Sequence, residues 1–82
     1  MNESINQKVT DILVNKIGLE ASEITKDANL TKDLGIDSLD FAELIMEFEQ
    51  AFDIKINDAD TAGFNTIKEV VDFIKAQVEN KN

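Results

Sequence analysis

Residues 33–52 read DLGIDSLDFAELIMEFEQAF and carry the clearest structural signal in the 82-residue chain. Asp37, followed three residues later by Asp40, is an aspartate version of the capping box, which marks the start of a helix. At roughly 100° per residue, four polar side chains fall on one narrow stripe of this helix. They are Asp40, Glu43, Glu47 and Gln50. We therefore expect a helix over residues 37–52, with an apolar arc wider than a surface helix needs.

Leu39 and Met46 lie at the border of that arc, directly beside the acidic stripe. A helix edge that combines acids with Leu and Met is typical of a docking surface, where charge steers a partner and apolar side chains anchor it. The same two side chains are equally suited to completing the hydrophobic core. Helical periodicity alone does not separate these two interpretations.

Toward the N-terminus, apolar residues recur at helical spacing from Ile5 to Ile17, and Gly18 follows as a C-terminal stop. This pattern predicts a helix over residues 3–17. Residues 19–36 show no sustained period and form a long irregular connection, which is uncommon in so small a domain. Because apolar residues are spaced along this connection, we expect it to pack against the helices.

Toward the C-terminus, residues 57–62 are expected to form one short helical turn that Gly63 closes. Thr66 and Glu69 then make a standard capping box, followed by apolar residues at helical spacing as far as Val78. The chain is therefore predicted to be all-α. We expect a four-helix bundle with three main helices, one short third helix and a long loop between helices 1 and 2.

The length and composition limit the classes of protein to which this chain can belong. We expect a single domain over residues 1–82. The chain has no cysteine and no histidine, which excludes a disulfide-rich mini-protein, a zinc finger, and thiol or imidazole catalysis. No apolar run approaches the roughly 20 residues that span a bilayer, and no secretory signal is recognisable at the start. We therefore expect a cytoplasmic protein that does not insert into membranes.

The net charge of −9 excludes a protein that binds nucleic acid through its phosphate backbone. Between Asp33 and Asp60 there are nine acidic residues and one base, Lys55, so nearly all of the net charge lies in one third of the chain. Such a field attracts basic partners and speeds their encounter. The alternative is a solvated face that keeps a small protein soluble.

One acidic motif approximates a calcium-binding loop. Residues 58–63, with Glu69 at the twelfth place, match several positions of an EF-hand. However, Ala62 stands at the fifth place and offers no side-chain oxygen, and Asn65 occupies the eighth place, where an apolar residue is expected. Glu69 also has an explanation as a helix cap. We therefore expect weak binding of divalent cations to the acidic region and no dedicated metal site.

Ser38 is the residue best placed for chemistry. The start of a helix offers free backbone N–H groups and the positive end of the helix dipole, both of which suit a phosphate. A free phosphate would be repelled by Asp37 and Asp40, whereas a covalently attached one would be held in place. On the residues alone, simple helix capping by Asp37 and Ser38 is the commoner reason for this pattern.

Residues 33–40, DLGIDSLD, resemble the attachment motif of acyl carrier proteins, D-L-G-x-D-S-L-D. Residues 43–47 and 49–56 also resemble that family's second helix and the loop after it. Helix order, acidity and length agree over almost the whole chain. The resemblance implies that a transferase attaches 4′-phosphopantetheine from coenzyme A to Ser38 through a phosphodiester. Asp37 would present Ser38 to this transferase and its metal.

The implied function is that of a carrier, not of an enzyme. The terminal thiol of the arm would hold acyl groups as thioesters for enzymes of fatty-acid synthesis or of a related specialised pathway. Those enzymes would dock their basic patches on Asp37, Leu39, Asp40, Glu43, Met46, Glu47 and Glu49. The acyl chain would shelter among Leu44, Phe48, Ile56, Phe64 and Ile67. We expect the carrier to be a monomer.

Two departures from the family pattern limit these expectations. Asn57 stands where the family commonly has proline, and Phe41 and Phe48 are bulkier than expected, which leaves the preferred acyl chain length open. Two alternatives also stay open. One is a carrier of aminoacyl or polyketide groups, and the other is an acidic helical adaptor or weak calcium-binding protein without a cofactor.

Overall fold

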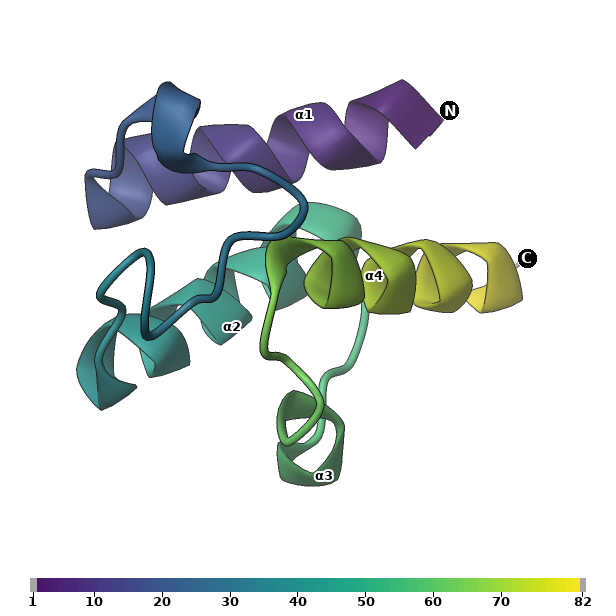
Figure 1. Ribbon diagram of the computed structural model, residues 1–82. Helices are drawn as coiled ribbons and strands as arrows, with labels where there is room; N and C mark the ends of the chain where they lie inside the picture. Colours follow the sequence, from purple (N-terminus) through teal and green to yellow (C-terminus); the bar gives the residue numbers. More distant parts are fainter. Residues whose placement is uncertain (1, 82) are drawn as a thin grey trace.

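The computed structural model describes residues 2–81, and the regular elements of this part of the chain are helical (Figure 1). In chain order they are α1 (Asn2–Ile12), a π-helical turn η1 (Leu13–Ile17), a 3₁₀ turn η2 (Ala21–Glu23), α2 (Ser38–Phe52), α3 (Asp58–Thr61) and α4 (Ile67–Lys81). Three long helices form the body, and the short α3 projects between two loops. The predicted all-α bundle, with its short third helix and its long loop, is confirmed. No helix in residues 2–81 is long and apolar enough to cross a membrane.

The first predicted helix, over residues 3–17, is present as α1 followed by η1. The backbone N–H of Gly18 donates to the Leu13 carbonyl at 3.1 Å, which is the wide i→i+5 bond of a π turn. Gly18 adopts the left-handed conformation with φ 88°, as the predicted C-terminal stop requires. The spacing of apolar residues did not predict the π turn, because one wide turn leaves the sequence pattern almost unchanged.

The hydrophobic core lies between α1, α2 and α4. Leu13, Leu44, Phe48 and Ile74 are almost completely buried at its centre. Full burial of such a side chain contributes about 1.5–3 kcal/mol to folding. No polar or charged residue among those described is buried with them. The core is therefore held by apolar packing and depends on no internal ion pair.

The long connection packs down as predicted, through the buried side chains of Leu30, Leu34 and Ile36. It is also tied by backbone bonds to the start of α4. The Leu30 N–H donates to the Asn65 carbonyl at 2.9 Å, and the Ile67 N–H donates to the Ala28 carbonyl at 3.1 Å. The connection is therefore fixed to the bundle by both its side chains and its backbone. Sequence reasoning missed the 3₁₀ turn η2 within it.

The end of this connection is shaped by its own side chains. The Asn29 Oδ1 atom accepts bonds from the N–H groups of Thr31 at 3.0 Å and Lys32 at 2.9 Å. In return, Asp33 Oδ2 accepts from the Asn29 N–H at 2.7 Å. Gly35 then takes a positive φ of 67°, which a residue without a side chain adopts at little cost. These bonds set the direction in which the chain enters α2.

The third helix is shorter than predicted. Residues 57–62 were expected to be helical, and α3 covers Asp58–Thr61 with Asn57 as its N-cap. The prediction that Gly63 closes this turn is wrong, since the described glycines with positive φ are Gly18 and Gly35. Instead Ala62 keeps the right-handed conformation, and the Gly63 N–H donates to the Asp60 carbonyl at 3.2 Å in an i→i+3 bond. No left-handed residue is needed there.

Candidate functional site

Ser38 is the first residue of α2, and Asp37 is the N-cap. Asp37 Oδ1 accepts the Asp40 N–H at 2.8 Å, so one half of the predicted capping box is formed. The return bond from the Asp40 carboxylate is not formed within the described residues, so that half of the prediction is wrong. Ser38 is exposed, and its hydroxyl has no hydrogen-bond partner in the part of the chain that the structure covers. Capping is therefore done by Asp37 and leaves the serine hydroxyl available.

A groove of about 360 Å³ begins at Ser38 and separates α2 from α3. Its lining residues are Ser38, Phe41, Ala42, Ile45, Met46, Glu49, Ile56, Asp58 and Thr61. Those from α2 follow Ser38 at intervals of three, four, seven, eight and eleven residues, which is the spacing of one helix face. This periodicity explains the unusually wide apolar arc of α2. It was also the signal by which Phe41 and Ile45 could have been placed on the same helix face as Ser38 from the sequence.

The residues predicted for an acyl pocket do not together line either of the two grooves described in this section. All five are buried in the core, as described for Leu44 and Phe48 and as found for Ile56, Phe64 and Ile67. Among them, only Ile56 lines the groove beside Ser38. Ile67 lines a separate groove on another side of the bundle. Leu44, Phe48 and Phe64 line neither groove, so the structure brings them together as packed core.

The acidic stripe lies on the opposite side of α2 from the groove. At roughly 100° per residue, Asp40, Glu43 and Glu47 are turned about half a revolution away from Ser38. Leu39 is 81% exposed and Met46 is 58% exposed, and both lie between the stripe and the groove. The interpretation that these two side chains complete the core is therefore wrong. The surface of α2 carries a continuous edge of apolar and acidic side chains.

Glu49 does not belong to this acidic stripe. It lines the groove, and its Oε2 atom accepts the Ile56 N–H at 2.9 Å. This bond joins the last turns of α2 to the segment that leads into α3. Glu49 and Asp37, both predicted to face partners, thus each hold a backbone amide of the fold.

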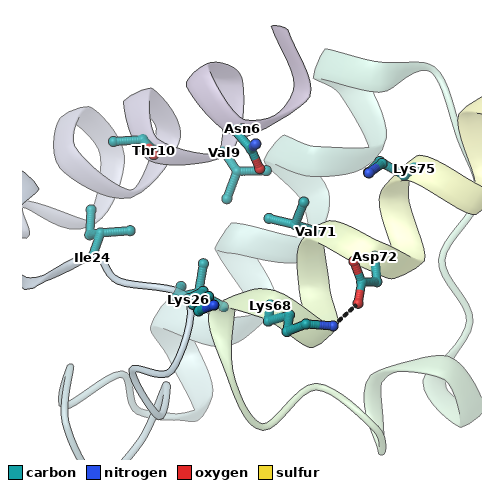
Figure 2. A pocket seen from close by; sticks show the side chains of 10 residues that line it. Asn6, Val9, Thr10, Ile24, Lys26, Lys68, Val71, Asp72 and Lys75 are labelled. Carbon is teal, nitrogen blue, oxygen red and sulfur yellow. Dashed lines mark hydrogen bonds and ion pairs between the residues drawn. The ribbon is translucent and has the colours of Figure 1, made fainter. Parts of the chain in front are cut away.

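A second groove, also of about 360 Å³, lies between α1, the long connection and α4 (Figure 2). Val9 and Val71 form its apolar floor, and Lys68 binds Asp72 at 2.8 Å on its edge. The hydrogen bond and charge of this pair raise the pKa of Lys68 and lower the pKa of Asp72. The groove shares no lining residue with the one beside Ser38. The sequence did not predict it.

Two carboxylates of the segment that approximates an EF-hand, those of Asp60 and Glu69, accept hydrogen bonds from backbone N–H groups. Asp58 and Asp60 lie in α3, and the Asp60 carboxylate accepts the Asn57 N–H at 3.1 Å. The Glu69 carboxylate accepts the Thr66 N–H at 2.9 Å, which confirms that capping box. Within residues 2–81, no three acidic side chains gather as metal ligands. The geometry is that of two helix starts rather than of an ion-binding loop.

Comparison with known proteins gives consistent matches. A family model described as "Phosphopantetheine attachment site" matches residues 7–74. An acyl carrier protein of Amoebophilus asiaticus is 46% identical over 77 residues, covering 94% of this chain and 96% of the relative. One from Syntrophobacter fumaroxidans is 43% identical, covering 82% of this chain and 83% of the relative. The crystal structure of an acyl carrier protein from Thermotoga maritima matches with a TM-score of 0.85 and 25% identity, covering 99% of this chain and 94% of that one.

Proposed function

We propose, from the premise that this chain belongs to the acyl carrier protein family, that Ser38 is the residue on which it bears phosphopantetheine. The chain is a carrier that holds acyl groups on this cofactor. The observation that carries the assignment is the exposed hydroxyl of Ser38, which has no partner among the described residues while Asp37 caps the helix. The oxygen is thus free to form the phosphodiester.

The surroundings of Ser38 fit a phosphodiester. Backbone N–H groups at the start of α2 would be available to a phosphate attached there, and the helix dipole would favour its negative charge. The carboxylates of Asp37 and Asp40 would repel a free anion, so the covalent bond is what keeps the phosphate there. The cofactor supplies the thiol for thioester chemistry, which a chain without cysteine lacks. The chain itself, we propose, catalyses no reaction.

The family implies interaction with enzymes that handle acyl groups. We propose that a phosphopantetheinyl transferase meets Ser38 with the help of Asp37. Synthesis enzymes with basic patches would then dock on the edge formed by Asp40, Glu43, Met46 and Glu47, with Leu39 beside it. The concentration of nine acids between residues 33 and 60 supports this choice of partner. We also propose that residues 1–82 act as a single monomeric domain in the cytoplasm.

The acyl chain would lie in the groove that starts at Ser38. The apolar lining from Ala42 and Ile45 supports this placement, since it faces the same side of α2 as the attachment point. Each methylene that leaves water for an apolar surface contributes about 0.8 kcal/mol. Ile56 is the member of the predicted acyl pocket that this route reaches directly.

The acyl groups of fatty-acid synthesis are the cargo that the acidity of residues 33–60 favours. A carrier of aminoacyl or polyketide groups would use the same serine with a different loading enzyme. The alternative of an acidic adaptor or calcium sensor without a cofactor is overturned by the family match over residues 7–74. Loading assays with fatty-acid and aminoacyl-loading enzymes separate the two carrier classes.

The experiment that tests the assignment is an intact-mass measurement. The protein is incubated with coenzyme A, magnesium and a broad-specificity phosphopantetheinyl transferase. We expect a gain of one phosphopantetheine group, no gain in Ser38→Ala, and an unchanged gain in Ser22→Ala, which removes another exposed serine. A gain that persists in folded Ser38→Ala would place the attachment elsewhere.

A further inference from the structure

Phe41 stands between the groove beside Ser38 and the hydrophobic core. It lies three residues after Ser38, lines the groove and is half-buried. Its ring meets the edge of the Phe64 ring, with 6.4 Å between the centroids. Phe64 is buried and in turn contacts Phe73 with the centroids 5.2 Å apart. A row of three aromatic rings therefore closes this part of the groove toward the core.

Such edge-to-face contacts resist displacement of the Phe41 ring. Each such contact stabilises the pair of rings beyond the area that it buries. Leu44 and Phe48 of the same helix are each only 1% exposed. Since protein cores are close-packed, an acyl chain enters such a core only where a side chain moves. On the outer side, the groove of about 360 Å³ is already open. This groove begins at the attachment point, so an acyl chain enters it without any movement of the core, beside the end of the cofactor arm.

We propose that Phe41 is a chain-length gate. Short and medium acyl chains lie in the α2/α3 groove, and longer chains gain no further shelter because the Phe41 ring blocks the way into the core. This inference rests on the proposed attachment of the cofactor to Ser38. The chain is thereby a carrier matched to short and medium acyl groups, and Phe41 sets the limit.

The test is a series of acetyl, octanoyl, dodecanoyl and hexadecanoyl forms, each checked by intact mass and melted under identical conditions. In the unaltered protein, the melting temperature rises from acetyl to octanoyl and changes by less than about 2 °C beyond it. In Phe41→Val, it rises by at least about 4 °C between the octanoyl and dodecanoyl forms. Phe73→Val is the matched control, because it removes a ring contact with Phe64 without altering the groove lining. In Phe73→Val, the melting temperature should stop rising at the same acyl chain length as in the unaltered protein.

NMR of the side chains of Leu44 and Phe48 gives a second measurement. Their signals should shift with a hexadecanoyl chain in Phe41→Val and stay unchanged in the unaltered protein. Phe41→Leu serves in the same way if the valine variant does not fold. A continuous rise of the melting temperature through hexadecanoyl in the unaltered protein, or the same plateau in both proteins, overturns the gate. Failure of the attachment itself would appear separately, as the absence of any mass gain.

Discussion

The Glu49 carboxylate accepts a hydrogen bond from the Ile56 N–H at 2.9 Å and so joins the end of α2 to the segment before α3. The two residues are seven positions apart, and both line the groove beside Ser38. This one bond therefore contributes to the width of the groove.

Glu49→Ala is expected to destabilise the fold by about 1.5 kcal/mol, because the Ile56 amide loses a charged acceptor in a partly buried position. The melting temperature should fall by roughly 6–12 °C in a domain of this size. Thermal unfolding followed by circular dichroism measures the change. Glu47→Ala, on the acidic stripe, should stay within about 0.5 kcal/mol. Equal losses in the two variants would show that the Glu49 bond carries no special weight.

Substitutions can separate the capping role of Asp37 from its proposed role in presenting Ser38 to the transferase. Asp37→Ala removes the cap on the Asp40 N–H and should cost about 1 kcal/mol of stability. Asp37→Asn keeps an oxygen at the cap and should leave the melting temperature almost unchanged. If the carboxylate presents Ser38 to the transferase and its metal, Asn will still slow the attachment of phosphopantetheine, measured as mass gain against time. Attachment at the normal rate in Asp37→Asn would restrict Asp37 to capping.

Reversing the charge of the stripe should slow association with a basic partner. For Glu43→Lys combined with Glu47→Lys, we expect the on-rate to fall roughly tenfold or more at low salt and the loss to shrink as salt is added. Stopped-flow or surface binding with an acyl-handling enzyme measures the rate. Asp11→Lys with Glu79→Lys changes the net charge by the same amount away from α2. An equal loss in that pair would assign the effect to total charge and not to the stripe.

Leu39 offers a test of the apolar part of the same surface. Since its side chain is 81% exposed, Leu39→Ala should leave the melting temperature within the range of ordinary surface substitutions. Partner affinity should fall by roughly tenfold if Leu39 anchors the complex. Isothermal titration with a docking enzyme reports the affinity. A variant that binds normally would remove Leu39 from the docking surface.

The Lys68–Asp72 pair predicts a defined pH dependence. The hydrogen bond to Lys68 lowers the pKa of Asp72 from 3.8. The Asp72 carboxylate therefore stabilises the folded state above pH 3.8, and this stabilisation is lost as pH falls through the folded pKa. The bond to Asp72 raises the pKa of Lys68 from 10.5. The Lys68 ammonium therefore stabilises the folded state below pH 10.5, and this stabilisation is lost as pH rises through the folded pKa. Both side chains are exposed, and the pair is therefore weak and screened by salt.

We expect Asp72→Asn to melt slightly below the unaltered protein between about pH 4 and pH 10. The difference in melting temperature should close as pH falls through the folded pKa of Asp72, which lies below 3.8, and it should also close in high salt. Paired thermal melts across pH and salt measure it. A difference that persists unchanged at high salt would point to packing by Asp72 and not to charge.

The elements that local signals specify were predictable from the sequence. Asp37 caps α2 and Thr66 caps α4, and each helix begins where its cap indicates because these bonds span three residues. The bond from Leu30 to Asn65 was not predictable, since it joins residues 35 positions apart and depends on the tertiary fold. The ending of the turn at Gly63 was predicted wrongly, because a glycine permits a left-handed stop without requiring one.

The candidate site also has features that local sequence signals predict and features that depend on the tertiary fold. Ser38 followed from the motif, and the position of Leu39 and Met46 beside the acidic stripe followed from periodicity, whereas their exposure became clear only in the structure. The groove did not, although Phe41 and Ile45 share a helix face with Ser38, because its other wall comes from α3. The bond of Glu49 to Ile56 likewise became apparent only when the chain had turned back on itself.

The π turn at the end of α1 affects which changes in chain length the protein can absorb. Its i→i+5 bond, from Gly18 to Leu13, encloses one residue more than an α-helical turn does. Deletion of the exposed Asn15 or Lys16 would convert this turn to α geometry and leave Leu13 and Gly18 in place. The same deletion in the middle of α2 would rotate Ser38 by roughly 100° relative to the residues after the cut. Natural length variants are thus expected at the end of α1 and not within α2.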